Sequence, residues 1–283
     1  MSRSYLFVPA DSERKLARAA DVGADALILD LEDSVAAAAR PVARELAAGY
    51  LKGRDNIWVR INPIDSGDAE ADLATVLVAE PAGIVLPKPR SAADVDLLAS
   101  QLDALEKAHG ITAGQTKIMA ICTERPEALF TLGSYVGASS RLVAMSWGAE
   151  DLSAALGASA SRDDAGNWLP TYELARSLAL CAAAAAEVAA IDTVYTDFRD
   201  TKGLAKYAAN ARRDGFSGML AIHPAQVEII NRAFVPTAAE IARAMRIVEL
   251  FADNPDAGTL GMDGEMIDRP HLLRAQRLLQ RQE

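Results

Sequence analysis

Cysteine is scarce in this 283-residue sequence, which contains only Cys122 and Cys181 and no CxxC spacing. That scarcity argues against a disulfide framework and against a cysteine-based zinc site. About half of the residues are hydrophobic, so a large core can form without either kind of cross-link. We therefore expect a protein of the reducing cytoplasm.

Long apolar runs and an excess of basic charge are also missing. The longest apolar run, Leu178 to Ala186, is shorter than a membrane span and is closed by Glu187. The residues after Met1 do not follow the pattern of a signal peptide. The net charge is −10, whereas a nucleic-acid surface is normally basic. We expect neither a membrane nor a nucleic acid as a partner.

Glycine-rich nucleotide loops are absent as well, because no GxGxxG or GxxxxGK[ST] follows any strand-like run. Their absence disfavours an open, doubly wound sheet. Eight short apolar runs do alternate with helical segments, and eight parallel strands close a β/α barrel. The predicted strands are Tyr5–Pro9, Ala26–Leu29, Ile57–Ile61, Gly83–Leu86, Lys117–Ile121, Leu142–Ser146, Thr193–Thr196 and Met219–Ile222.

The spacing of apolar residues predicts helices between these strands, among them Ser12–Ala20, Ala92–His109, Pro126–Tyr135 and Tyr172–Ala190. Asn254–Asp268 is richer in Gly, Pro and Asp, and it separates two further helices, Ala239–Ala252 and His271–Gln282. The predicted fold is α/β: a TIM-like β/α barrel with a C-terminal helical extension. We place the catalytic barrel at residues 1–253 and the linker with its helix at residues 254–283.

Polar residues follow most of the predicted strands, where the active site of a β/α barrel lies. Charged or hydrogen-bonding groups should therefore converge on one rim. They are Asp30, Glu32 and Asp33, Arg60 and Asn62, Lys88, Glu124 and Arg125, Glu150 and Asp151, Asp197 and His223.

Glu124 and Asp151 follow neighbouring strands and form a candidate magnesium site. Magnesium takes oxygen ligands, commonly one or two carboxylates, and keeps several waters. Two acids at this rim could hold it while leaving positions open for substrate. Each could instead be an acid in the first turn of a helix, where the helix dipole favours negative charge.

Three basic residues are candidates for binding anionic parts of a substrate. Arg60 ends a strand and could bind a carboxylate through two parallel hydrogen bonds, or could form an ion pair with a rim acid. Arg3 and Lys15 belong to a local basic concentration that could bind a phosphate-bearing tail such as that of coenzyme A. A solvated helix face is the alternative for that segment.

Ten motifs in register resemble the citrate lyase β-subunit group within the HpcH/HpaI aldolase family, over nearly the whole chain. They are Arg3-Ser4-Tyr5-Leu6-Phe7-Val8-Pro9, Gly23-Ala24-Asp25-Ala26, Leu29-Asp30-Leu31-Glu32-Asp33, Arg60-Ile61-Asn62, Leu86-Pro87-Lys88, Thr123-Glu124, Gly148-Ala149-Glu150-Asp151, Gly215-Phe216-Ser217-Gly218, Ile222-His223-Pro224-Ala225-Gln226 and Gly264-Glu265-Met266-Ile267-Asp268.

The resemblance implies a TIM-like barrel with Mg²⁺ on Glu124 and Asp151, and Arg60 on the carboxylate of a 2-keto acid. It implies that Asp268 transfers a proton in the active site of a neighbouring subunit, so the enzyme would be a homo-oligomer, a trimer or a hexamer. The implied contacts to coenzyme A fall partly on the N-terminal basic segment, on Arg3 and Lys15.

The expected function is that of a magnesium-dependent carbon–carbon lyase. It would cleave a 3-hydroxyacyl-CoA thioester of the malyl- or citramalyl-CoA type to acetyl-CoA and a 2-keto acid. Alternatives are a citrate lyase β subunit acting on a carrier-protein thioester, an HpcH-type pyruvate aldolase, and a thioester hydrolase or malate synthase. The aldolase branch typically has a histidine where this chain has Asp33. A silent scaffold or binding protein is the non-enzymatic alternative.

Overall fold

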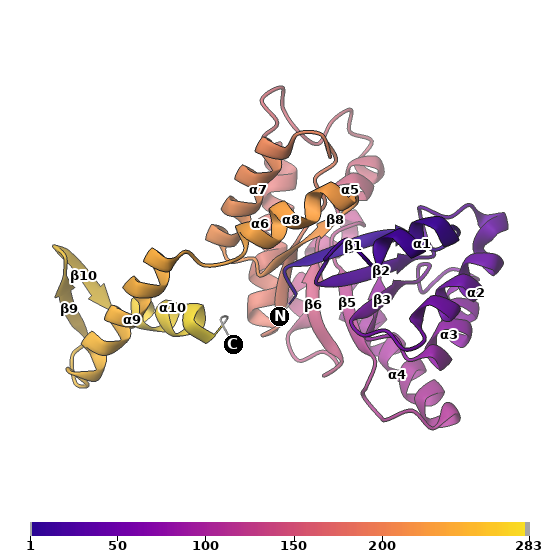
Figure 1. Cartoon of the computed structure of the whole chain (residues 1–283), viewed down its shortest axis with the longest axis horizontal. Helices are drawn as coiled ribbons and strands as arrows, with labels where there is room; N and C mark the ends of the chain where they lie inside the picture. The colour runs from indigo at the N-terminus through magenta and orange to yellow at the C-terminus, as the bar shows by residue number, and fades with distance from the viewer. Residues whose placement is uncertain (1, 281–283) are drawn as a thin grey trace. The chain divides into compact units, whose positions relative to one another are not determined.

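A closed barrel of eight parallel strands forms the centre of the N-terminal part of the chain (Figure 1). The computed structural model describes residues 2–280. Strands β1 and β8 close the ring, with Tyr5 opposite Leu220. This arrangement confirms the predicted fold. The strands are β1 Ser4–Pro9, β2 Ala26–Asp30, β3 Ile57–Arg60, β4 Gly83–Leu86, β5 Lys117–Ile121, β6 Leu142–Ser146, β7 Ala189–Asp192 and β8 Gly218–Ala221.

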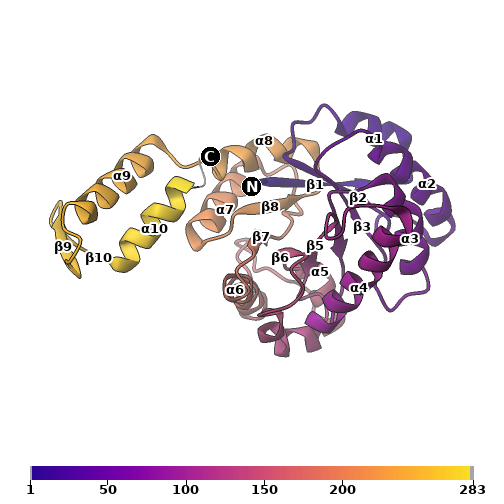
Figure 2. The same cartoon turned by 90° about the horizontal axis from the view of Figure 1, so that it is seen from below.

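Helices follow the strands and cover the outside of the barrel (Figure 2). Each strand contributes at least one apolar side chain to a shared core that includes Tyr5, Ile28, Trp58, Met119 and Leu220. The α-helices of this part are α1 Glu13–Ala19, α2 Arg40–Leu51, α3 Ala69–Val76, α4 Ala92–His109, α5 Ala149–Leu156, α6 Pro170–Ala185, α7 Thr201–Asp214 and α8 Pro224–Ala233. Short 3₁₀ helices are η1 Ala37–Ala39, η2 Leu77–Ala79, η3 Pro126–Phe130 and η4 Leu132–Tyr135.

The segment around the seventh strand differs from the prediction. The predicted helix Tyr172–Ala190 extends too far, because α6 ends at Ala185 and Glu187 takes a left-handed backbone with φ 59°. The predicted strand Thr193–Thr196 was therefore wrong, since β7 is Ala189–Asp192 and pairs with β6 and β8. The helix propensity of the alanines concealed the beginning of the strand.

The predicted helix Pro126–Tyr135 was also wrong, because this segment forms η3 and η4 instead. Thr131 separates them with φ −118° and donates its hydroxyl to the carbonyls of Arg90 and Ala128. These contacts hold the segment in tight i→i+3 turns rather than in one continuous helix.

The chain from Ala233 forms a second compact unit, distinct from Ser2–Arg232. It contains α9 Ala238–Ala252, the hairpin strands β9 Thr259–Met262 and β10 Glu265–Asp268, and α10 Arg269–Gln280. Ile247 and Phe251 of α9 pack in one core with Ile267 of β10. The predicted boundary between the barrel and the C-terminal extension, at residues 253 and 254, therefore lies too far along the chain, because α9 packs within the C-terminal unit.

The predicted linker Asn254–Asp268 contains this hairpin. Asp263 and Gly264 both have positive φ, the backbone that a tight two-residue hairpin turn requires, so Met262 pairs with Glu265. The predicted end of the last helix, Gln282, lies outside the described residues. Among residues 2–280, no helix is both long enough and apolar enough to cross a membrane.

Candidate active site

Arg60 and Asp30 form the innermost ion pair at the rim where the barrel strands end. Arg60 donates Nε and Nη2 to the two carboxylate oxygens of Asp30, both at 2.7 Å. Burial opposes ionisation of Asp30, but the Arg60 guanidinium outweighs it and lowers the pKa of the carboxyl. Arg60 Nη1 lies 3.0 Å from Glu32 Oε2. The ion pair with a rim acid, one of the alternatives for Arg60, is therefore present.

Lys88 connects the acids of the rim through both its backbone and its side chain. Its φ of 52° is left-handed, and its backbone N–H donates to Glu124 Oε2 at 2.6 Å. Its Nζ lies 2.5 Å from Glu32 Oε1, 3.0 Å from Asp33 Oδ2 and 3.1 Å from Asp151 Oδ1. A left-handed backbone is costly for a residue with a Cβ and is often found at functional sites. Lys88 therefore belongs to the rim charge network.

Glu124 and Asp151 line one small cavity together with Arg60, as the sequence predicted. The cavity has a volume of about 80 Å³. Glu124 follows β5 and is 4% exposed, whereas Asp151 lies in the first turn of α5, with its side chain 32% exposed. Burial, and then the nearby carboxylates of Glu32 and Asp151, raises the pKa of Glu124 well above its usual range.

This concentration of buried negative charge fits a divalent cation. Burial also raises the pKa of Glu32 to about 7 against the opposing effects of Arg60 and Lys88. Arg60 and Lys88 contribute two positive charges among the four rim acids Asp30, Glu32, Glu124 and Asp151, so carboxyl groups are in excess. Among residues 2–280, no three His, Cys, Asp or Glu side chains are arranged to ligate one ion. Two carboxylates and several waters are nonetheless a usual set for magnesium.

Gly148 allows Glu124 to take its position. A Cβ atom on Gly148 would lie 2.5 Å from Glu124 Cγ, closer than side chains tolerate. The Gly148 backbone N–H also donates to Thr123 Oγ1 at 3.1 Å. The Gly-Ala-Glu-Asp motif thus provides space for one candidate metal ligand and supplies the other, Asp151.

The chain is similar to the proteins of one known family. The model of the HpcH/HpaI aldolase/citrate lyase family matches residues 3–224. The chain belongs to this family. The family resemblance of the sequence motifs is thereby confirmed, and the chain joins a family of carbon–carbon lyases.

Individual members of the family resemble the chain over almost its full length. A citrate lyase subunit beta-like protein of Mycobacterium tuberculosis (strain ATCC 25618 / H37Rv) is 34% identical over 98% of this chain and 94% of its own. A mitochondrial citramalyl-CoA lyase of Rattus norvegicus is 31% identical over 98% and 85%. The crystal structure of CitE from M. tuberculosis with magnesium, acetoacetate and coenzyme A is 33% identical, covers 99% and 97%, and has a TM-score of 0.82.

Apolar side chains form the other walls of the rim cavity in this family member. Phe7, Ile121, Trp147, Val194 and Leu220 line it. Such walls exclude water and strengthen the electrostatic interactions inside.

Asp192, at the end of β7, fixes one of these walls and was missed by the sequence analysis. It accepts hydrogen bonds from Trp147 Nε1 at 2.7 Å and from the Tyr207 hydroxyl at 3.1 Å, and it pairs with Arg176 at 2.8 Å. The predicted rim residue Asp197 instead accepts backbone N–H groups in its own loop. The sequence analysis missed Asp192 because the predicted strand, Thr193–Thr196, ended four residues after the true end of β7.

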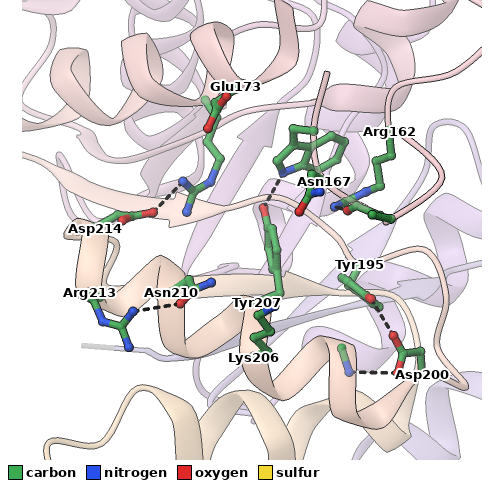
Figure 3. Close-up of a pocket in the computed structure, with 15 residues that line it drawn as sticks. Arg162, Asn167, Glu173, Tyr195, Asp200, Lys206, Tyr207, Asn210, Arg213 and Asp214 are labelled. Carbon is green, nitrogen blue, oxygen red and sulfur yellow. Dashed lines mark hydrogen bonds and ion pairs between the residues drawn. The ribbon is translucent and has the colours of Figure 1, made fainter. Parts of the chain in front are cut away.

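A larger cavity of about 620 Å³ lies apart from the rim acids, between residues 162–176 and 195–214 (Figure 3). Arg162 lies over the Trp168 ring at 3.4 Å, and Trp168 Nε1 donates to the Tyr207 hydroxyl at 3.2 Å. Asp200 accepts a hydrogen bond from Tyr195 (Figure 3). Both cationic and acidic side chains line this cavity.

The remaining predicted site residues, Arg3, Lys15 and Asp268, are not among the residues that line the rim cavity. Arg3 precedes β1 at the N-terminal end of the barrel, opposite the rim, and forms a two-point ion pair with Asp25 at 2.7 and 2.8 Å. Lys15 is exposed in the first turn of α1, on the rim side. Asp268 ends β10 in the C-terminal unit, with its side chain 31% exposed. The structure therefore does not bring Arg3 together with Arg60, Glu124 and Asp151.

Proposed function

We propose that this protein is a magnesium-dependent lyase that cleaves a 3-hydroxyacyl-CoA thioester to acetyl-CoA and a 2-keto acid. The observation that carries the proposal is the rim cavity, in which under-compensated buried acids lie beside a guanidinium and apolar walls. The M. tuberculosis relative crystallised with magnesium, acetoacetate and coenzyme A supports the ligand classes. The citramalyl-CoA lyase relative supports the substrate class.

Glu124 and Asp151 would hold the magnesium ion, and Arg60 would hold the carboxylate of the hydroxy-acid end. Asp30 engages Nε and Nη2 of Arg60, and Glu32 Oε2 lies 3.0 Å from Nη1, so a substrate carboxylate would share Nη1 with Glu32. Magnesium, when bound, supplies Lewis-acid polarisation for carbon–carbon cleavage. Lys15, on the rim side, is the remaining candidate for a coenzyme A phosphate.

In cleavage the hydroxyl group loses its proton to solvent and becomes the keto group as the carbon–carbon bond breaks. This releases a thioester enolate, which must gain a proton at carbon to become acetyl-CoA. We assign that proton to Asp268, delivered from the C-terminal unit of a neighbouring subunit in a homo-oligomer. In the synthetic direction the same carboxylate removes the proton. The apolar walls, with Trp147 held by Asp192, exclude water from the enolate.

The test is a magnesium-dependent assay of malyl- and citramalyl-CoA that follows keto-acid and free coenzyme A separately. We expect keto acid and acetyl-CoA in equal amounts. Release of free coenzyme A without keto acid would show that the enzyme is a thioester hydrolase and not a lyase. Activity only on a thioester of the acyl carrier protein would instead indicate a citrate lyase β subunit. Inactivity on all of them, with no keto-acid binding, would favour the scaffold.

The cytoplasmic location stays a prediction from the two unpaired cysteines.

A further inference from the structure

Glu124 and Asp151, the two candidate magnesium ligands, share one direct polar partner. The Lys88 backbone N–H donates to Glu124 Oε2 at 2.6 Å, and Lys88 Nζ lies 3.1 Å from Asp151 Oδ1. Within residues 2–280, no other hydrogen bond or ion pair reaches either of these two carboxyl groups. The direct polar contacts of both acids therefore depend on a single residue.

The backbone of Lys88 is strained where it makes these contacts. Its φ of 52° is left-handed, and the next residue is Pro89. A proline normally restricts the residue before it to an extended backbone with negative φ. Such a conformation persists only where the surrounding structure holds it, and it is commonly found at functional sites. In this conformation the N–H and the side chain of one residue reach two different carboxyl groups.

The Lys88 ammonium also bridges two opposite sides of the barrel rim. Glu32 and Asp33 follow β2, whereas Asp151 follows β6, and these strands lie opposite each other in the closed ring. Nζ lies 2.5 Å from Glu32 Oε1 and 3.0 Å from Asp33 Oδ2. Burial opposes the positive charge of Lys88, but the hydrogen bond to Glu32 outweighs it and raises the pKa of the ammonium. The three N–H donors of the ammonium match these three carboxylates, so protein groups occupy it and it is neither a base nor a free substrate ligand.

We propose that Lys88 is a positioning residue that presets both magnesium ligands before the ion binds, an inference that rests on the proposed ligand roles of Glu124 and Asp151. The backbone N–H fixes the buried carboxyl of Glu124. The ammonium keeps Asp151 at the cavity that both acids line. No bond of Lys88 forms or breaks in the reaction, because it acts through the two carboxylates.

The ammonium has two opposing effects on magnesium binding. It repels the cation, but it also holds together acids that repel one another. Burial, and then the charges of Glu32 and Asp151, raises the pKa of Glu124, so these carboxylates are close enough to oppose one another. Asp151 is 32% exposed and could turn into solvent without its partner. Partners of metal ligands commonly change metal affinity by about 10- to 100-fold, so we expect the loss of positioning to outweigh the loss of repulsion.

The experiment measures Mg²⁺ binding by calorimetry in full-length Lys88→Met and Lys88→Gly, with Lys107→Met as the matched control on exposed α4. Methionine keeps the length of the side chain without its charge. Glycine takes a left-handed backbone at no steric cost, so this variant folds even where the methionine variant does not. We expect magnesium affinity to fall by about 10- to 100-fold in Lys88→Met. The fall should be smaller in Lys88→Gly, because its N–H still reaches Glu124, and absent in Lys107→Met.

Saturating magnesium separates positioning from catalysis. We expect kcat of both Lys88 variants to recover toward the wild-type value once the metal site is filled. A kcat that stays low at saturation would overturn the inference, because Lys88 would then act in the reaction step. Unchanged or tighter magnesium binding in the folded variants would also overturn it, and would leave the proposed function standing. A wild type that binds no magnesium would instead overturn the metal site of the proposed function itself.

Discussion

At the scale of single residues, both signs of charge surround the buried carboxyl of Glu124. Lys88 supplies an N–H and an ammonium group, while Glu32 and Asp151 add negative charge. Because buried like charges resist ionisation together, the site is poised to take up a cation or a proton.

Glu124→Gln tests this balance, because it removes the charge and keeps the shape. We expect the affinity for Mg²⁺ to fall by at least about 10-fold, since even outer-shell changes commonly cost that much. The metal-free variant should melt no lower than the wild type, because a disfavoured buried charge is gone. Calorimetric titration and thermal unfolding measure the two effects. Unchanged magnesium affinity would refute the ligand assignment.

Gly148→Ala tests the space that Glu124 needs. The added methyl group would lie 2.5 Å from Glu124 Cγ, so the carboxyl must move. We expect kcat/KM to fall by about 10-fold or more, as misplaced catalytic groups typically cause. Gly133→Ala is the control, because an added Cβ there meets nothing within 4 Å. Equal activity of the two variants would show that the close contact does not matter.

The sequence predicted which acids and which arginine would meet, because strand ends share one rim in a β/α barrel. It placed Lys88 at the rim, with a role in the charge network as one alternative, but it did not predict the left-handed backbone of this lysine, which apolar spacing does not encode. It also left open which partner Arg60 would take, because both alternatives need the same residue types. In the structure, Asp30 accepts hydrogen bonds from Nε and Nη2 of Arg60.

At the scale of secondary-structure elements, the order of the strands around the barrel could be predicted from the sequence, but two boundaries of helices and strands could not. Alternating apolar runs are strong signals, whereas an alanine-rich helix leading directly into Ala189 gives no contrast between helix and strand. Thr131 donates a hydrogen bond to the carbonyl of Arg90, which is distant in sequence, and this contact interrupts the predicted helix. Such tertiary hydrogen bonds override local propensity.

The packing of α4 against the start of β6 depends on a buried ion pair, Arg141 with Glu106. Glu106 is 1% exposed and accepts from Arg141 Nη1 at 2.8 Å and from the Thr116 backbone N–H at 2.9 Å. Burial alone would raise the pKa of Glu106, but these donors, led by Arg141, lower it to about 2. The carboxylate therefore stabilises the folded state above its unfolded pKa, and this contribution is lost as the pH falls toward 2.

Glu106→Gln should consequently lose stability at neutral pH and lose less in acid. The linkage is worth on the order of 3 kcal/mol. Asp103→Asn is the matched control, because Asp103 pairs with the same arginine through a side chain that is 67% exposed. Its effect should stay below about 1 kcal/mol. Urea unfolding across acidic and neutral pH measures both variants, and a pH-independent loss in Glu106→Gln would contradict the linkage.

At the scale of the whole molecule, the proposed catalytic groups are divided between two compact units. Arg60, Glu124 and Asp151 belong to the barrel, and Asp268 belongs to the unit that begins at Ala233. The C-terminal unit has its own core, in which Phe251 of α9 packs with Met262 and Ile267 of the hairpin. The sequence patterns predicted that a C-terminal extension exists. They did not predict the short hairpin, because the glycine and aspartate content of this segment is typical of a linker.

Two inactive variants can show whether Asp268 serves the barrel of another subunit. Glu124→Gln has an intact Asp268, and Asp268→Asn has an intact barrel. If the active site combines residues of two chains, co-expression should restore activity, because some barrels then meet an intact Asp268 from a neighbour. Random mixing of equal amounts in a symmetric ring predicts about one quarter of wild-type activity. The double variant Glu124→Gln/Asp268→Asn mixed with wild-type chains provides the control for exchange of subunits. Mixtures that remain inactive, although mass spectrometry shows mixed oligomers, would place Asp268 in the active site of its own chain.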